Sequence, residues 1–285
     1  MSRRYGWIPD VVDDNDPIYQ VPLSVGSIVP TRVDLRSLCP CVYDQGNLGS
    51  STANAIAAAM QVCQKKQGQV NRLPARLFLY YNERNMVDAG YGPLQTSARF
   101  PKNYFSVMGD VKYMSLRKRS ILKGTLADGD TGAMLRDGLK SAATVGVPPE
   151  TMYNPAKFTD KPSDEAYAEA LNHRIIRYER IPRDIALLKA CLAEGFPFVF
   201  GIAAYETLES VDVAKTGVLN LPKTREQLLG GQAVMAVTYD DAYQRFMCRN
   251  SFGRTWGING HFTIPYSYVL NSNLAADFWM VRSIS

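Results

Sequence analysis

The sequence has few of the residues that build metal sites or disulfide frameworks. It holds five cysteines and two histidines among 285 residues. The cysteines are odd in number and show no framework spacing, which is typical of proteins from reducing compartments. The closest pair, Cys39 and Cys41, has no histidine near it in the sequence. We therefore expect no metal site.

Long hydrophobic runs are also missing. The most apolar stretch, residues 195–205, is much shorter than the roughly 20 residues of a membrane helix. The first sixteen residues carry two arginines and four aspartates where a signal peptide has an apolar centre. We expect no membrane contact, no signal peptide and an intracellular, reducing location, with association to a virion as one option.

Basic charge is concentrated in one segment. The chain has a net charge of +5, whereas residues 99–123 alone hold seven basic residues against Asp110, a net charge of +6. Four aromatic residues are interleaved with these charges, as on surfaces that contact nucleic acid or acidic proteins. A solvated loop has the same composition, so both interpretations stay open. The candidate partner-binding residues are Arg117, Lys118 and Arg119.

The order of the expected elements favours an α+β protein. Apolar residues at helical spacing predict a buried helix over 50–67, with Ser50 as its N-cap and Gly68 after its end. Further helices are expected at about 75–88 and 132–145. From about residue 173 the pattern changes to strands, interrupted by one helix over 182–195. Helices followed by strands indicate two packed lobes, and ligands usually bind in the cleft between lobes.

These patterns also predict the domain organisation. Residues 1–30 are expected to form an extended N-terminal arm, and residues 31–285 a single two-lobed domain. Within that domain, about 31–150 form a mainly helical lobe and about 151–285 a mainly β lobe. The helical lobe is expected to carry an exposed insertion at 91–127, which contains the basic segment.

The start of the buried helix is the candidate site. The stretch DQGNLGSSTANAIAAAM places Ser51 where backbone N–H groups and the helix dipole favour a negative charge. This stretch resembles the nucleophile region of the papain-like cysteine peptidases, where a turn carries the oxyanion-hole Gln and the helix opens with the catalytic Cys. The resemblance places Gln45 at the oxyanion position and Ser51 at the nucleophile position.

Three further blocks extend the resemblance over nearly the whole chain, and they are similar to the bacterial and viral branch of the family. CRNSFGRTWGINGHFTI resembles the Asn-Ser-Trp-Gly block, which places Asn250 where the family orients its catalytic His. GGQAVMAVTYDD resembles the block that supplies this His, and Gln232 holds its position. GDTGAMLRDGLKSAATVGVPPE resembles a wall of the substrate cleft. The expected cleft residues are Gly49, Ser50, Gly132 and Phe252, the last in place of a shielding Trp.

The resemblance implies a papain-like two-lobed fold, with a helical lobe, a β-barrel-like lobe and the active-site cleft between them. In the family, a Cys thiolate attacks the carbonyl and an imidazolium protonates the leaving amine. The Ser51 hydroxyl needs a general base, and the Gln232 amide has no usable basicity near neutral pH. His173 and His261 occupy no motif position, so they are not expected to supply that base.

Two hypotheses follow, and neither needs a cofactor. The first is a catalytically inactive papain-like protein that binds a peptide or protein in its cleft or serves as a structural protein. The second is a cysteine endopeptidase presented with its active site substituted. In either case Gln45, Asn250 and the helix start at Ser51 keep an oxyanion-type pocket. The natural residues at positions 51 and 232 discriminate between the two hypotheses.

Overall fold

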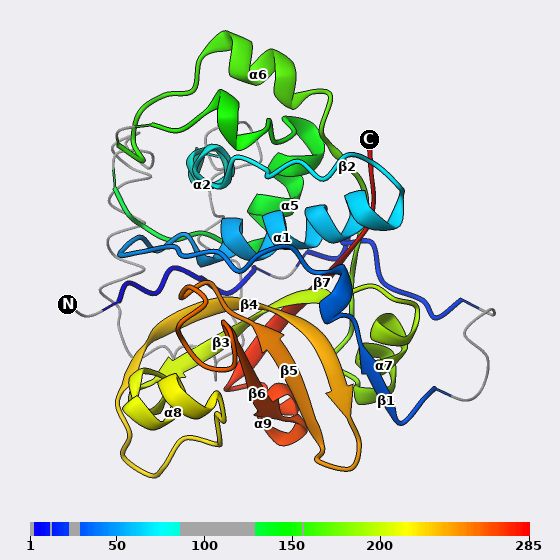
Figure 1. Ribbon diagram of the computed structural model, residues 1–285, viewed down its shortest axis with the longest axis vertical. Coiled ribbons are helices and arrows are strands. Elements are labelled where there is room, and N and C mark those ends of the chain that lie inside the picture. Colours follow the sequence, from blue (N-terminus) through cyan, green and yellow to red (C-terminus); the bar gives the residue numbers. More distant parts are fainter. Residues whose placement is uncertain (1–2, 12, 23–28, 86–128, 156) are drawn as a thin grey trace.

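The helices α1, α2, α5 and α6 gather on one side of an antiparallel sheet (Figure 1). The computed structural model describes residues 3–11, 13–22, 29–85, 129–155 and 157–285. The α-helices are α1 (Ser51–Lys66), α2 (Arg76–Asn85), α5 (Leu135–Thr144), α6 (Asp164–Ala170), α7 (Ile185–Ala193), α8 (Val211–Thr216) and α9 (Tyr266–Leu270). The strands are β1 (Arg32–Asp34), β2 (Ile175–Arg180), β3 (Phe198–Tyr205), β4 (Leu228–Asp240), β5 (Arg245–Arg249), β6 (His261–Pro265) and β7 (Ala275–Ile284). Short 3₁₀ turns span Arg36–Leu38, Glu150–Met152 and Glu206–Glu209.

Helix α1 is buried along most of its length, as its alanine-rich sequence predicts. Every residue from Ser51 to Gln64 is buried, because small side chains let neighbouring elements approach from all sides. Ser50 is the N-cap residue, but its side chain makes no capping hydrogen bond. Its Oγ instead accepts a bond of 3.1 Å from Asn54 Nδ2. The helix ends before Gly68, whose φ of +68° is the left-handed conformation typical of a helix end.

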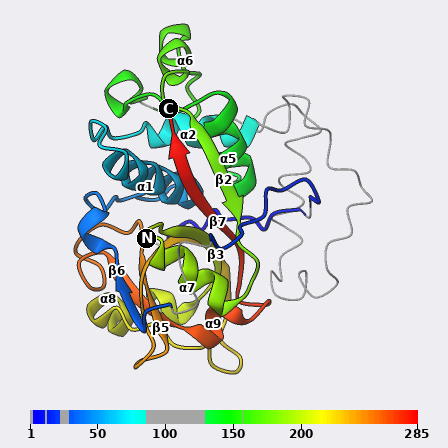
Figure 2. The same ribbon diagram turned by 90° about the vertical axis from the view of Figure 1, so that its right-hand side faces the viewer.

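The strands form one antiparallel sheet in the order β2-β7-β3-β4-β5-β6, with β1 paired to β4. Figure 2 shows β7 rising beside α1 and α5 to the C-terminus, with β2 antiparallel to it. Along β3 and β4, alternate residues belong to different cores. Val199, Ala233 and Met235 pack with the helices, while Phe200 and Val234 pack on the opposite side. The two-residue period of a strand produces this division.

Two hydrophobic cores result from the sheet. One joins α1, α2 and α5 to one face of β4 and β7. The other fills the side that α7, α8 and α9 help to cover, and it is rich in aromatic residues from β3, β5 and β7. A smaller cluster packs Ala166 and Ala170 of α6 against Phe78 of α2. Helical packing therefore continues beyond residue 150, where the sequence places the start of the mainly β part.

Most predicted elements are confirmed, with shifted ends. The first predicted helix is found almost as expected. The helix predicted over 75–88 is α2, which the structure describes to Asn85. The helix predicted over 132–145 is α5, which starts at Leu135 because Met134 is still extended, with ψ of 144°. The strands expected after residue 173 are all present.

The N-terminal arm is extended where the structure describes it. It forms isolated β-bridges rather than a strand: Trp7 pairs with Ala133, and Ile18 pairs with Arg180. In Figure 1 the dark blue arm passes between α1 and the sheet. In the part of the chain that is described, no helix is both long and apolar enough to cross a membrane.

Candidate active site

The four residues assigned to the catalytic positions lie together between α1 and the sheet. Ser51 is the first residue of α1, Gln232 lies in β4, Asn250 follows β5, and Gln45 lies in the turn before α1. The antiparallel pairing of β4 with β5 brings Gln232 near Asn250. The turn is attached to the Asn250 block because Gln45 N donates to Ser251 O at 2.9 Å. All four side chains are buried.

The Gln232 side chain acts as a hydrogen-bond donor. Its Nε2 lies 2.9 Å from Asn250 Oδ1, 3.0 Å from Gln45 Oε1 and 3.3 Å from Ser251 Oγ. Its Oε1 is buried and has no hydrogen-bond partner among the described residues. An imidazole N–H can make the same bond to Asn250, but only an imidazole can also exchange a proton near neutral pH. Position 232 thus keeps the bond to Asn250 and loses the base.

The Ser51 hydroxyl is fully buried and has no base as a partner. Its Oγ accepts a hydrogen bond of 3.1 Å from the backbone N of Ala233. Within the described ranges, no carboxylate or imidazole bonds to this oxygen. An alcohol without a base stays protonated and is a poor nucleophile.

The two histidines do not replace the missing base. His173 Nε2 lies 2.8 Å from Glu169 Oε1 beside α6. His261 Nδ1 lies 3.2 Å from Asn259 O, and burial lowers the pKa of His261. Neither ring bonds to Ser51 in the described structure. Both histidines therefore lie outside the catalytic arrangement, in agreement with the sequence analysis.

Phe252 lies beside the site under residues of the N-terminal arm. Its ring meets Trp256 edge-on at 5.3 Å between ring centroids, and Tyr5 edge-on at 6.4 Å. The Arg3 guanidinium lies 4.1 Å from the Phe252 ring centroid. The Phe252 ring is therefore buried between Trp256 and the arm.

The cleft between the predicted walls holds residues of the N-terminal arm, which sequence analysis did not place there. Trp7 N donates to Gly231 O at 2.8 Å on the sheet side. On the other side, Ala133 N donates to Gly6 O at 2.8 Å and Ile8 N donates to Ala133 O at 2.9 Å. Residues 6–8 thus bond to both walls at once. We call residues 3–10 the cleft segment.

Glycines make this close fit possible. A Cβ added to Gly6 would lie 1.6 Å from Gly49 O, so no side chain fits there. A Cβ on Gly201 would lie 1.8 Å from the indole of Trp7. Gly132 has a φ of +68°, and a Cβ there would lie 2.2 Å from Gly6 O. Gly6 therefore lies in close contact with both Gly49 and Gly132, two of the expected cleft residues.

The expected oxyanion donor is already in use. Gln45 Nε2 donates to Leu48 O at 2.8 Å and to Arg4 O at 3.3 Å. A carbonyl of the cleft segment therefore lies where the resemblance places the carbonyl of a substrate. The sequence signal that could have revealed this segment is Tyr5-Gly6-Trp7, two large aromatics around a glycine in a polar arm. Both rings are buried.

Ser50 is buried at the N-cap of α1 beside the cleft. Arg117, Lys118 and Arg119, with the whole of the 91–127 insertion, lie outside the described residues. Across the ranges described above, no three His, Cys, Asp or Glu side chains group in a way that could hold a metal ion.

The proteins to which this chain is similar include a peptidase C1-like protein, a cysteine protease and a procathepsin B. No family model matches the chain. An uncharacterized peptidase C1-like protein of Acanthamoeba polyphaga mimivirus is 38% identical over 312 aligned residues, covering 100% of this chain and 88% of the relative. The crystal structure of xylellain, a cysteine protease from Xylella fastidiosa, is 37% identical with a TM-score of 0.77, covering 100% of this chain and 99% of that chain. Procathepsin B S9 from Trypanosoma congolense has a TM-score of 0.68 at 14% identity, covering 99% of this chain and 86% of that chain, a likeness of fold alone.

Proposed function

This chain belongs to the papain-like cysteine peptidase family, in its viral and bacterial branch, and we propose that it is a catalytically inactive member. Its proposed role is to bind a peptide or protein, or to serve as a structural protein. The observation that carries the proposal is the pair Ser51 and Gln232 at the nucleophile and base positions. Among the described residues, neither side chain is bonded to a group that could make Ser51 reactive.

The expected loss of turnover is large. Peptide hydrolysis in this family needs a thiolate and an imidazolium that act as one unit. Removal of one member of such a unit costs a factor of about 10⁶ in turnover, and removal of the second adds little. The amide at position 232 can donate to Asn250 but cannot accept a proton from Ser51. Binding groups are retained without the groups that transfer protons.

The cleft segment indicates which ligand the groove suits. Gly231 O accepts from Trp7 N, while Ala133 accepts from Ile8 N and donates to Gly6 O. An extended peptide can use these same backbone groups. A peptide ligand therefore has to displace residues 3–10 first. The proposed binding function in the cleft depends on how firmly this segment is held.

A direct test uses the native chain with an unfolded protein substrate. Purified protein is incubated with casein and with a fluorogenic peptide library, beside a Ser51→Ala variant as the matched control. We expect no cleavage above buffer from either protein. A thiol-directed epoxide should leave position 51 unmodified. Cleavage that disappears in Ser51→Ala would contradict the proposal.

The second candidate function is a cysteine endopeptidase presented with a substituted active site. The observation in its favour is the 37% identity to xylellain, which is named as a cysteine protease. Under this hypothesis the natural gene encodes Cys at position 51. It also has to explain Gln232 at the His position and Phe252 in place of the shielding Trp, so it requires three separate changes. Sequencing the natural gene at these positions decides between the two.

A partner contact through the basic segment is part of the proposal. Residues 99–123 carry a net charge of +6 with aromatic residues interleaved, which favours an acidic protein or nucleic acid. Such binding weakens as salt rises, because the ions compete for the same charges. Arg117→Glu, Lys118→Glu and Arg119→Glu together should weaken binding to an acidic polymer while leaving the melting temperature nearly unchanged. If this variant binds the polymer as tightly as the wild-type protein does, residues 99–123 are not a partner-binding site.

A further inference from the structure

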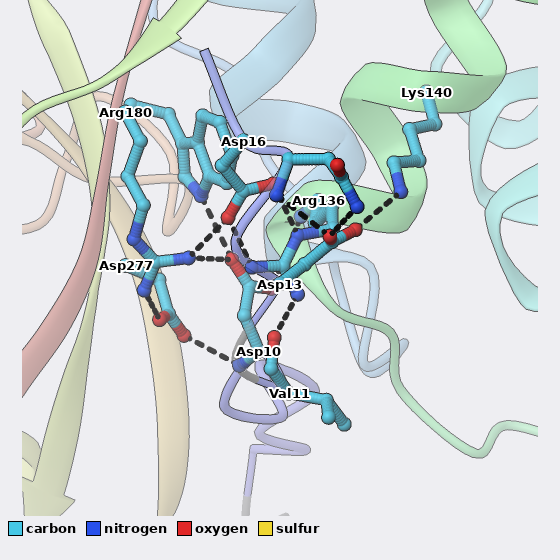
Figure 3. A network of polar contacts seen from close by, with 10 residues as sticks. Asp10, Val11, Asp13, Asp16, Arg136, Lys140, Arg180 and Asp277 are labelled. Atoms are coloured by element: carbon cyan, nitrogen blue, oxygen red, sulfur yellow. Dashed lines mark hydrogen bonds and ion pairs between the residues drawn. The ribbon is translucent and has the colours of Figure 1, made fainter. Parts of the chain in front are cut away.

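A buried cluster of charged residues lies outside the active site and attaches the cleft segment to the fold (Figure 3). It contains Asp10 and Asp16 from the arm, Arg136 from α5, Arg180 from the end of β2, and Asp277 from β7. The Asp10, Asp16 and Asp277 side chains are 0%, 3% and 2% exposed. Figure 3 shows Arg136 and Arg180 approaching these carboxylates from different elements.

Asp10 is fixed by three neighbours. The backbone N of Arg136 donates to Asp10 Oδ1 at 3.1 Å, and Trp279 Nε1 donates to Asp10 Oδ2 at 2.8 Å. The backbone N of Asp10 donates to Asp277 Oδ2 at 2.7 Å. Asp10 ends the cleft segment, only two residues after Ile8. These bonds therefore attach the segment to α5 and to β7 at once.

The arginines complete the attachment. Arg136 binds both carboxylate oxygens of Asp16, with Nε 2.8 Å from Oδ1. Arg180 lies 3.1 Å from Asp16, 2.9 Å from Asp277 and 3.5 Å from Asp10. Each guanidinium thus bridges the arm to the body of the protein. Such pairs are strong only when all the buried charges are compensated.

The charges of this cluster are not balanced. Three buried carboxyl groups face two guanidinium groups. Lys140 Nζ lies 3.1 Å from Asp13 Oδ2 beside the cluster (Figure 3), and this pair is partly exposed, with the Asp13 and Lys140 side chains 28% and 25% exposed. On β2, Glu179 is engaged by Arg177 and Arg282 instead. One carboxyl of the cluster is therefore left without a cation of its own.

An uncompensated buried carboxyl group takes up a proton. Burial and the nearby Asp277 raise the pKa of Asp10 from 3.8 to about 8, although Arg136 and Arg180 act in the opposite direction. Burial also raises the pKa of Asp277. The pair Asp10 and Asp277 thus holds a proton near neutral pH.

We propose that this cluster is a proton-controlled latch that fastens residues 3–10 in the cleft. With a proton on the Asp10 and Asp277 pair, the cluster has two negative and two positive charges, and the segment is held. Loss of that proton leaves an extra buried negative charge, and the segment is released more often. The cleft is therefore most closed in mildly acidic solution and opens more often as the pH rises.

The direction of the pH dependence and the pH range over which it acts follow from the Asp10 pKa in the released and in the closed segment. In the released segment the Asp10 pKa returns toward 3.8, while in the closed cleft it is about 8. A carboxyl group with a raised pKa in the closed state binds more protons there. Closure is then favoured at low pH, and the equilibrium constant for closure falls by a factor of about ten per pH unit between the two pKa values. Above about pH 8 the dependence levels off.

Hydrogen exchange of the full-length protein tests the latch. The probes are the amides of Trp7, Ile8 and Ala133, which bond across the cleft, and the reference is the amide of Ala236 in β4. Protection factors are corrected for the intrinsic exchange rate and measured from pH 5 to pH 9. We expect the cleft amides to lose about tenfold in protection per pH unit up to about pH 8. The reference amide should change much less.

Variants of the unbalanced pair should abolish this dependence. Asp277→Asn removes one carboxylate and suits the φ of +59° at this position, which asparagine tolerates well. Asp10→Asn removes the other carboxylate and serves if Asp277→Asn does not fold. Either variant should make the protection of the cleft amides nearly independent of pH between pH 5 and pH 8. The control Asp13→Asn, at the partly exposed pair, should keep the wild-type slope.

Three outcomes would overturn the latch. Wild-type protection at Trp7 and Ile8 that is flat from pH 5 to pH 8 would show that no proton is linked to closure. A slope retained in both Asp277→Asn and Asp10→Asn would assign the proton to another group. A parallel fall at Ala236 would show that the cluster stabilises the whole fold and does not control the segment.

Discussion

At the scale of single residues, position 232 determines what the site can do. The Gln232 amide directs its N–H groups toward the oxygens of Asn250, Gln45 and Ser251, while Gln232 Oε1 and Asn250 Nδ2 are buried with no hydrogen-bond partner among the described residues. The same amide cannot carry a proton between Ser51 and a leaving group. Under the proposed function, this amide is the reason why the site is chemically inert.

The first prediction concerns Gln232→Glu. This nearly isosteric change replaces the N–H donor by a carboxylate oxygen facing Asn250 Oδ1 and Gln45 Oε1 in a fully buried position. We expect a loss of about 3 kcal/mol or more in the free energy of unfolding at pH 7. Burial raises the pKa of the new carboxyl, so the loss should shrink as the pH falls toward 4. Urea denaturation at both pH values measures it, and an equal loss at both would contradict the explanation.

The second prediction concerns Gly6→Ala in the cleft segment. The added methyl group meets Gly49 O at 1.6 Å, so the segment has to move. Overpacking of this kind costs about 1–3 kcal/mol. Amide exchange at Trp7 and Ile8 should quicken more than exchange in the central strands.

The matched control is Gly129→Ala, where an added Cβ finds an ordinary contact of 3.4 Å with the Thr131 side chain. We expect little change in stability or exchange for this variant. If both alanine variants behave alike, the close fit of Gly6 does not hold the segment in place.

At the scale of elements, α1 and the sheet could be predicted well from the sequence. The run of small apolar residues from Ala53 onward specifies a buried helix, and the two-residue alternation in β3 and β4 specifies strands with two covered faces. The start of α5 was misplaced because nothing local distinguishes Met134, still extended, from Leu135. Helix ends depend on the cap residue and on tertiary contacts, which a periodic pattern does not contain.

A third prediction concerns the cap of α7. Asp184 Oδ1 accepts hydrogen bonds from Ala186 N at 2.8 Å and Leu187 N at 3.1 Å. Asp184→Ala leaves these donors without the carboxylate and should lower the free energy of unfolding by about 1 kcal/mol. Asp184→Asn keeps an accepting oxygen and should recover most of this loss. Equal losses in urea denaturation of the two variants would assign the effect to charge alone.

At the scale of the whole molecule, the predicted α+β papain-like fold is confirmed. The fold brings Gln232 into hydrogen-bond contact with Asn250 and Gln45, and Ser51 Oγ accepts from the backbone N of the neighbouring Ala233. The occupant of the cleft could not be predicted in the same way. Contacts such as Gly6 with Gly49 and Gly132 join distant parts of the chain, and no spacing in the sequence reports them. The cluster of Asp10 with Asp277 is equally non-local.

The proposed function requires that the papain-like scaffold is retained and that positions 51 and 232 alone lack the groups for chemistry. Reactivity of a restored thiol measures this claim directly. The single variants Ser51→Cys and Gln232→His and their combination are each exposed to a thiol-directed epoxide at pH 7. Each is prepared with and without Gly6→Ala, and intact mass reports labelling at position 51.

An imidazole beside the thiol lowers the thiol pKa, so the double variant should react at least about tenfold faster than Ser51→Cys alone. Gly6→Ala should increase this rate further by displacing the segment that covers the thiol. Gln232→His without the cysteine should not be labelled at position 51. If Ser51→Cys alone reacts as fast as the double variant in both backgrounds, position 232 is not the site of the missing base and the central claim is wrong.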